Sequence, residues 1–253
     1  MMRRGLTIVE ILAVLTVLSV LGAILLPAIG GVRGSARTTE SLSQLRQMTF
    51  AAQRYTDRWN RFPMAVRYEP GDGAVRTLAW DWQQTATGET VPGPMWRFTD
   101  TPDEVLRCPA WRGADGAEGE PFSGYNYNTS YLGGEASYGT TGWDAIRWGL
   151  RPAAVRRPAD AVIFGAGGWR GGTNKFMRAP GNREGLDPWT LHAGGQAFRY
   201  HGGRTVTAHL DGHVATSAQA QLPPEPDLMA AEQVMDHPRN GFLSSDDRAY
   251  DPR

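Results

Sequence analysis

The chain has 253 residues and no formal net charge, because 26 Lys and Arg side chains balance 26 Asp and Glu side chains. This balance excludes a strongly basic protein that attracts nucleic acid, and the 8 Phe, 8 Tyr and 9 Trp exclude a disordered stalk. With 31 Gly and 17 Pro the composition favours a turn-rich body of strands, and a single cysteine, Cys108, allows no internal disulfide.

Residues 6–29 form an apolar segment that is interrupted only by Thr7, Glu10, Thr16 and Ser19. As a helix this segment is about 36 Å long, enough to cross a hydrocarbon core of about 30 Å. It is longer than the apolar part of a cleaved secretory signal peptide, and no clear small-x-small cleavage site follows it. A carboxylate inside the bilayer costs about 2.5 kcal/mol or more, so a plain signal anchor does not explain Glu10.

Two arginines, Arg3 and Arg4, precede the apolar segment. Because positive charge is retained on the cytoplasmic side, they predict a cytoplasmic N-terminus and a C-terminal body on the other side of the membrane. We therefore expect a protein with a single membrane-spanning helix.

The sequence GLTIVE at residues 5–10 joins this basic leader to the apolar segment. It resembles the processing site of type IV prepilins and type II secretion pseudopilins. The resemblance implies that a membrane-bound prepilin peptidase cuts between Gly5 and Leu6 and methylates the new N-terminus of Leu6. The first mature residue in that family is usually Phe, so Leu6 is a conservative departure. Pro27 matches a proline common in these subunits and predicts a kink or local melting of the helix.

The resemblance also implies a role for Glu10. In such fibres this glutamate pairs with the free α-amino group of a neighbouring subunit, inside a bundle of apolar helices where a lone carboxylate is costly. The implied partners are the peptidase and methyltransferase, other pilin-like subunits and an inner-membrane assembly platform. The implied location is the inner membrane, with the head in the periplasm or on a surface fibre. Glu10 is then an assembly residue, and no catalytic residue is expected.

A second helical segment, residues 30–60, continues from the apolar one. Its apolar residues recur at steps of three and four, as on one face of an amphipathic helix: Leu42, Leu45, Met48, Ala52, Tyr55 and Trp59. Pro63 is expected to stop the helix. The sequence thus predicts one nearly continuous helix from about Leu6 to about Trp59, whose second half packs under a globular head.

Residues 61–222 have the short apolar stretches and frequent Gly and Pro of a mainly antiparallel β-sheet head with long loops. Residues 161–164 give the firmest strand, which is expected to end at Gly165. The fold class is therefore expected to be α+β. Its expected parts are a cleaved leader (1–5), a membrane or fibre-core helix (6–29), an amphipathic helix (30–60), the head (61–222) and a polar C-terminal tail (223–253) with a short helix at 228–235.

The best local signal in the head lies between Phe198 and Thr216. Strands at 198–201, 205–210 and 213–216, with a type I′ turn at Asp211-Gly212, predict a three-stranded antiparallel meander. His201, nine residues and then Asp211-Gly212 also resemble a pattern found with pilin-type leaders in pseudopilin-like families of planctomycetes and related bacteria. The runs LRCP at 106–109 and GYNYN at 124–128 resemble further stretches of those proteins.

Metal binding is an alternative for this region, since imidazole and carboxylate groups bind zinc and similar ions. The candidates are His201, His209, Asp211 and His213. Turn chemistry alone accounts for Asp211-Gly212, and His201 is expected to make a packing hydrogen bond, so no metal is assigned. Three acidic clusters are candidates for structural calcium, although none has EF-hand spacing: Asp100, Asp103 and Glu104; Asp115, Glu118 and Glu120; and Asp246 and Asp247.

The sequence has no Gly-x-Ser-x-Gly elbow, phosphate loop or His-Glu-x-x-His pair. Cys108 is expected to be a small buried residue. The expected function is therefore that of a pseudopilin or minor pilin-like structural subunit. One alternative is a membrane-anchored module that binds polysaccharide through exposed tryptophans, and Trp80 and Trp82 would share one side of a strand. The other is a metal-dependent envelope enzyme built around His201, His209, Asp211 and His213.

Overall fold

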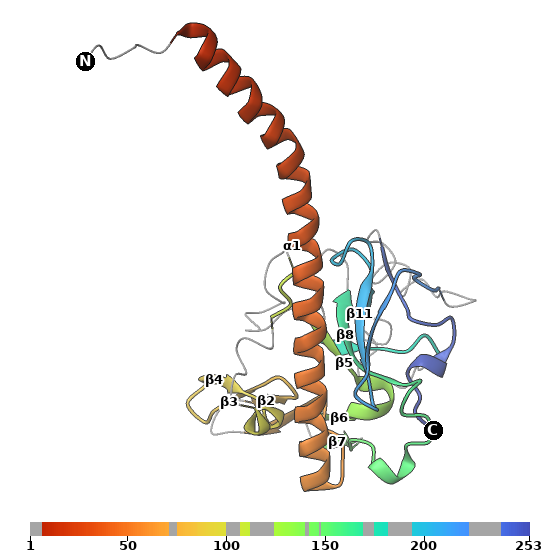
Figure 1. The fold of residues 1–253 in the computed structure, drawn as a ribbon. Coiled ribbons are helices and arrows are strands. Elements are labelled where there is room, and N and C mark those ends of the chain that lie inside the picture. The colour runs from red at the N-terminus through yellow and green to blue at the C-terminus, as the bar shows by residue number, and fades with distance from the viewer. Residues whose placement is uncertain are drawn as a thin grey trace.

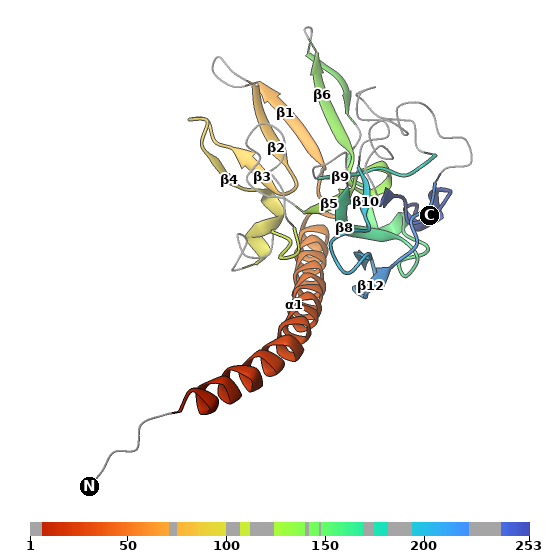
Figure 2. The same cartoon turned by 90° about the horizontal axis from the view of Figure 1, so that it is seen from above.

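The computed structural model describes residues 7–70, 75–99, 107–111, 124–139, 142–146, 148–168, 175–181, 194–222 and 239–253. These residues contain a long N-terminal helix and two β-sheets whose strand pairs are mostly antiparallel (Figure 1; Figure 2). The expected α+β class is confirmed.

Helix α1 runs from Ile8 to Trp59, so the two expected helical segments form one continuous element. Asn60 is the C-cap of the helix, and its left-handed φ of 52° turns the chain three residues before Pro63. The backbone stays helical at Pro27 rather than melting there. The half of α1 that projects from the head is curved (Figure 1).

The C-terminal half of α1 contributes one face to the main hydrophobic core. Leu45, Met48 and Ala52 are fully buried there, in one cluster with strand residues such as Phe164 and Val206. All three helix residues belong to the expected apolar stripe. Trp59, at the end of the same stripe, is 58% exposed, so the stripe leaves the core before the helix ends.

The first sheet has the strand order β4-β3-β2-β1-β6-β7. Its elements are β1 (Val66–Pro70), β2 (Val75–Ala79), β3 (Trp82–Gln84), β4 (Thr90–Pro92), β6 (Glu135–Gly139) and β7 (Gly142–Ile146), and the 3₁₀ helix η1 (Pro94–Phe98) follows β4.

Trp80 lies in the turn between β2 and β3, and Trp82 is the first residue of β3. The expectation that both would lie on one side of a single strand is therefore wrong. Both are buried. Trp80 packs against Tyr127 and Phe164, at ring-centroid distances of 5.7 and 5.3 Å. These tryptophans therefore build the core and offer no exposed binding face.

The second sheet has the strand order β12-β11-β8-β10-β13, and β5 pairs with both β8 and β9. Its strands are β5 (Tyr125–Asn128), β8 (Val162–Gly168), β9 (Phe176–Met177), β10 (Gly195–Ala197), β11 (Thr205–His209), β12 (Val214–Ser217) and β13 (Asn240–Gly241). The π-helix η3 (Thr129–Gly133) and the 3₁₀ helix η4 (Pro152–Ala154) lie between β5 and β8 in the chain, and the 3₁₀ helix η6 (Asp247–Ala249) follows β13.

The expected three-stranded meander is wrong. Residues 198–201 form no strand, and the strand before them, β10, is separated from β11 by β8. Strand β8 is buried along its whole length and continues through Gly165 instead of ending there, so it offers both edges to partners. Gly202 and Gly203, with φ of 65° and 84°, belong to a crossover past β8 and not to a tight hairpin.

Residues 239–253, expected as part of a polar tail, belong to the head. Strand β13 pairs with β10, and Phe242 and Tyr250 are completely buried in a second apolar cluster with Val162. Burial of these two aromatic side chains holds the segment against the head although most of its other residues are polar, so the segment is a structural part of the fold. The helix expected at 228–235 lies outside the described residues.

We expect Met48→Ala to lower the free energy of unfolding by about 2–5 kcal/mol, because it opens a cavity where the helix meets the strands. Phe50→Ala, at a site that is 55% exposed on the same helix, is the matched control and should change it by no more than about 0.5 kcal/mol. Urea denaturation of the full chain in detergent micelles, followed by tryptophan fluorescence, measures both. Equal effects of the two variants would contradict the assignment of this face to the core.

Candidate functional site

The N-terminal half of α1 carries large apolar side chains that are exposed on all sides of the helix. They are Ile8, Val9, Ile11, Leu12, Val14, Leu15, Val17, Leu18, Val20, Leu21, Ile24, Leu25, Leu26 and Val32. By length and composition this helix is able to cross a membrane. The structure is therefore compatible with a single-pass membrane anchor.

Glu10 lies in the first turn of α1 and forms a capping box with Thr7. Its Oε2 accepts hydrogen bonds from the backbone N and from Oγ1 of Thr7, both at 2.8 Å, and Glu10 N donates to Thr7 Oγ1 at 3.3 Å. The Thr-x-x-Glu spacing is a sequence signal for this box, which was missed in the sequence analysis. Gly5 and Leu6, the expected cleavage site, lie outside the described residues.

Three of the sequence motifs meet α1 at one place, the helix–head junction, which consists of Thr38, Ser41, Cys108, Tyr125 and His201. Cys108 Sγ lies 3.6 Å from Ser41 Oγ and 3.7 Å from His201 Nε2. The other imidazole nitrogen, Nδ1, lies 3.3 Å from Thr38 Oγ1. The Tyr125 hydroxyl donates to Gln44 Oε1 at 2.7 Å and lies 3.5 Å from the carbonyl oxygen of Ser41. The junction thus ties the head to the helix through side chains from three distant segments.

The thiol and the imidazole of the junction are both neutral near pH 7. Cys108 is 1% exposed, and burial raises the pKa of its thiol. Burial also lowers the pKa of His201 to about 4. Because the Thr38 hydroxyl donates to the carbonyl of Gly34 at 3.1 Å, the imidazole donates from Nδ1 and presents the lone pair of Nε2 to the thiol. A cysteine nucleophile needs a thiolate, so this arrangement suits a packed contact and not nucleophilic catalysis.

The helix side of the junction was not expected from the sequence, in which only apolar residues were assigned to the buried face. Ser41 is nevertheless completely buried. Thr38 and Ser41 continue the steps of three and four residues that lead to Leu45 and Met48. That spacing is the signal that places them on the same face of the helix.

Strand β5, the YNYN part of the GYNYN motif, joins several segments through buried polar side chains. Asn126 Nδ2 donates to two backbone carbonyls at the start of β10, at 3.3 and 3.0 Å. Asn128 Nδ2 donates to the carbonyl oxygens of Val162 and Tyr250, both at 2.8 Å. The Tyr127 hydroxyl donates to a carbonyl in the segment after α1 at 2.9 Å. This strand therefore fixes the position of four separate parts of the chain.

The Asp211-Gly212 hairpin joins β11 to β12, but its turn is not of type I′. His209 N donates to His213 O and Gly212 N donates to His209 O, both at 2.9 Å. The angle φ is positive at Gly212 (93°) and not at Asp211. These features define a three-residue loop, in which a type I turn precedes a left-handed residue. Asp211 Oδ1 accepts a hydrogen bond from His213 N at 3.0 Å, so the carboxylate shapes the loop.

The four residues considered for a metal site lie in two different places. His209 and His213 stack with 4.0 Å between their ring centroids, and His213 Nδ1 lies 2.6 Å from Asp211 Oδ1. His201 instead belongs to the helix–head junction. Among the residues that the structure describes, no three His, Cys, Asp or Glu side chains are grouped as metal ligands. Burial, with the nearby His213, lowers the pKa of His209 to about 4.

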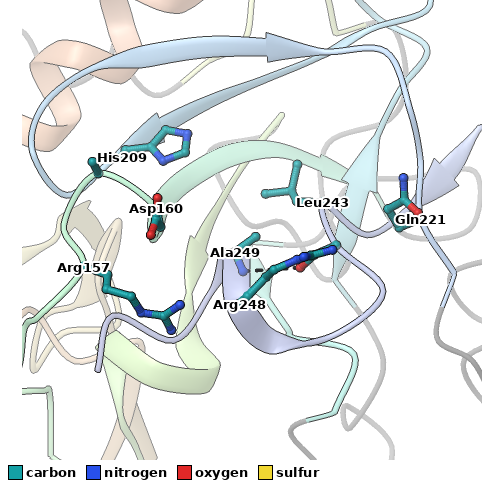
Figure 3. A pocket seen from close by; sticks show the side chains of 9 residues that line it. Arg157, Asp160, His209, Gln221, Leu243, Arg248 and Ala249 are labelled. Carbon is teal, nitrogen blue, oxygen red and sulfur yellow. Dashed lines mark hydrogen bonds between the residues drawn. The ribbon is translucent and has the colours of Figure 1, made fainter.

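A groove of about 500 Å³ opens beside His209 (Figure 3). Its two arginines are engaged with protein groups. Arg157 donates to the backbone oxygens of Asp251 and Arg253 at 2.9 and 3.1 Å, and Arg248 pairs with Asp246 at 3.3 Å. We therefore assign no ligand to this groove, which is lined by Arg157, Ala159, Asp160, His209, Gln221, Leu243, Ser244, Arg248 and Ala249.

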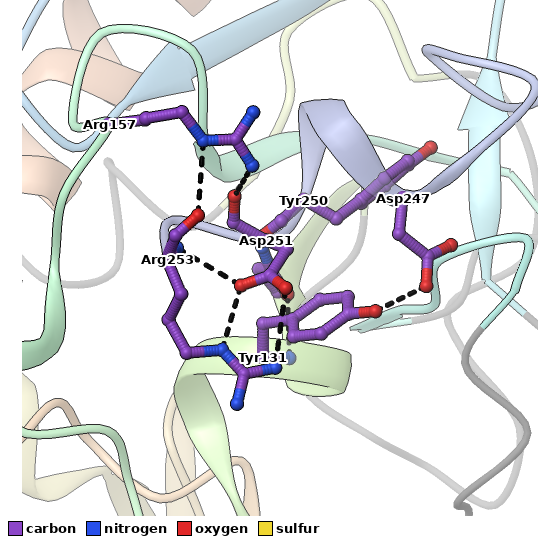
Figure 4. Close-up of polar contacts among 7 residues, drawn as sticks. Tyr131, Arg157, Asp247, Tyr250, Asp251 and Arg253 are labelled. Atoms are coloured by element: carbon purple, nitrogen blue, oxygen red, sulfur yellow. Dashed lines mark hydrogen bonds and ion pairs between the residues drawn. The ribbon is translucent and has the colours of Figure 1, made fainter.

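The acidic pair Asp246 and Asp247, considered for calcium, is bound by protein donors. Asp247 accepts hydrogen bonds from the Tyr131 hydroxyl, drawn in Figure 4, and from Gly181 N at 2.6 Å. Asp246 Oδ1 accepts from Arg248 N at 3.2 Å as the N-cap of η6. Asp247 therefore fastens the C-terminal segment to the head, whereas Asp246 caps a helix within that segment. The other two acidic clusters lie outside the described residues.

No family model, curated protein or solved structure matches this chain. Its own residues define a class of protein in which a β-rich head is fastened to one end of a helix. The other end of that helix is apolar and exposed.

We expect Asn128→Leu to lower the free energy of unfolding by about 2–5 kcal/mol, because the carbonyls of Val162 and Tyr250 lose a donor inside the fold. Gln219→Leu likewise replaces an amide side chain with Leu, at an exposed site, and should stay within about 0.5 kcal/mol of the wild type. Urea unfolding of both variants tests this. A cost at position 128 no larger than at position 219 would argue against the role of β5.

The pKa of His201 predicts a loss of stability in acid. In the unfolded chain His201 takes up a proton near the ordinary pKa of 6.5. In the folded chain it takes up that proton only when the pH falls to about 4. Stability should therefore fall as the pH drops from about 6.5 to about 4. His201→Gln should flatten this slope in urea titrations at several pH values, whatever its effect at pH 7. An unchanged slope would contradict a buried neutral imidazole.

Proposed function

We propose that this protein is a pseudopilin or minor pilin-like structural subunit. It is cut between Gly5 and Leu6, methylated on Leu6 and assembled into a type II secretion or type IV pilus-like fibre. The observation that carries the proposal is the projecting half of α1, whose apolar side chains are exposed on all sides. A helix that is hydrophobic all round needs a bilayer or copies of itself to cover it, and a fibre subunit uses each in turn.

Glu10 supports assembly over simple anchoring. Both hydrogen bonds from Thr7 use Oε2. A carboxylate accepts donors at both oxygens, so Oε1 can receive the α-amino group of a neighbouring Leu6 without loss of the cap. This pair neutralises two charges that would otherwise be costly among apolar helices.

The proposed arrangement places the N-terminus in the cytoplasm and the head in the periplasm, with the protein in the inner membrane until it joins the fibre. Its partners are the prepilin peptidase, neighbouring subunits and the assembly platform. The neutral thiol and imidazole of the helix–head junction support a structural role over an enzymatic one.

We expect the protein from its own cells to begin at N-methylated Leu6, and Glu10→Ala to be absent from sheared fibres and crosslinked multimers. The matched control is Glu40→Ala, which removes an exposed carboxylate from the same helix outside its apolar half and should still assemble. Intact-mass and N-terminal analysis measure the processing, and the fibre fraction measures assembly.

Two results would count against the proposal. An uncut chain that starts at Met1 or Met2 would leave a simple anchored domain. A cleaved Glu10→Ala protein found in fibres at the wild-type level would remove the assembly role of Glu10.

A further inference from the structure

Among the residues that the structure describes, two tryptophans are exposed: Trp59 is 58% exposed and Trp148 is 50% exposed. The other tryptophans whose burial the structure describes are all in the interior: Trp80, Trp82, Trp96 and Trp111. Because tryptophan is usually buried in the core, neighbouring tryptophans that stay exposed indicate a surface that contacts another molecule.

Trp59 is the last residue of α1, and this end of the helix lies opposite its apolar half (Figure 1). Two hydrogen bonds bring the chain segment that contains Trp148 to the same end. Arg61 Nη1 donates to Gly149 O at 3.1 Å, and Phe62 N donates to the carbonyl of the next residue along at 2.9 Å. These bonds fix the chain just after Trp59 against the chain just after Trp148. We call the surface made by Arg58, Trp59, Arg61 and Trp148 the end patch.

The guanidinium group of an arginine lies over each indole ring of the end patch. Arg58 Cζ lies 5.8 Å from the Trp59 ring centroid, and Arg61 Cζ lies 6.0 Å from the Trp148 centroid. Arg151, which is also exposed, follows Trp148 by three positions in the chain. In a chain with no net charge overall, this concentration of arginine is a local property of the patch.

We propose that the end patch binds an acidic polysaccharide. A flat indole face covers the C–H face of a sugar ring, while the planar guanidinium fork binds a carboxylate through two parallel hydrogen bonds. Arg61 uses Nη1 for its bond to Gly149, so the Nε and Nη2 side of its guanidinium is the side that would bind the carboxylate. The same Trp and Arg combination occurs twice, which suits a ligand that repeats a flat apolar ring and a carboxylate along its length. An acidic protein would complement the charge equally well, but it would not repeat this pairing.

This proposal concerns the head and does not depend on assembly through Glu10. The test is therefore made on the full-length chain in detergent micelles, by titration calorimetry with polygalacturonate, neutral dextran and poly-glutamate. We expect saturable binding of polygalacturonate that weakens as salt rises and no binding of dextran. Trp59→Ala and Trp148→Ala should each weaken binding by about tenfold or more, and Arg58→Gln should weaken it and reduce its salt dependence.

Phe50→Ala is the matched control, because Phe50 is an exposed aromatic residue on the same helix and should leave binding unchanged. Trp59→Phe keeps an aromatic ring and should retain part of the affinity, which separates loss of contact from loss of folding. The proposal is overturned if polygalacturonate does not bind, if the tryptophan variants bind as well as the wild type, or if dextran binds equally. Equal binding of poly-glutamate would also overturn it, in favour of an acidic protein partner.

Discussion

The fold depends on the packing of one segment of α1 inside the head. Leu45, Met48 and Ala52 are completely buried in the main core, and Gln53 Nε2 donates to Leu210 O at 2.9 Å. Because the same unbroken helix continues into the projecting half, the head cannot slide along the helix or turn around it without opening its own core. Force or displacement at one end of α1 is therefore transmitted to the head through a packed interface and not through a flexible linker.

Polar contacts make this arrangement specific. Buried amide and hydroxyl groups are costly unless they are hydrogen-bonded, and those of Asn126, Tyr127 and Asn128 each donate to the backbone of another segment. The junction around His201 and Cys108 works in the same way, with neutral partners that need no compensating charge. An apolar core alone would tolerate several placements of the head, whereas these directional bonds favour one.

The sequence predicted those helices, strands and turns whose formation depends on residues close together in the chain. The helix end at Trp59 and the strands β11 and β12 follow from apolar spacing and from turn chemistry at Asp211-Gly212. The strand order did not follow, because alternation along β10 and β11 carries no information about β8, which comes earlier in the chain and lies between them. The junction was missed for a similar reason: burial of Ser41 depends on partners more than sixty residues away. Burial of the C-terminal segment was not predicted, because Phe242 and Tyr250 stand among polar residues that are typical of an exposed tail.

The two proposed tasks of this protein, assembly and ligand binding, lie at opposite ends of α1. The helix has 52 residues and is therefore about 78 Å long, with Glu10 in its first turn and Trp59 at its last position. In the proposed fibre, a change at the assembly end would leave the end patch untouched, and the reverse would also hold. A fibre would also present one end patch per subunit, so that weak binding at each patch sums to high avidity along a polymer that repeats its own sugar units. A single membrane-anchored copy would have no such gain, so the affinity of fibres for an acidic polysaccharide should exceed that of the isolated subunit.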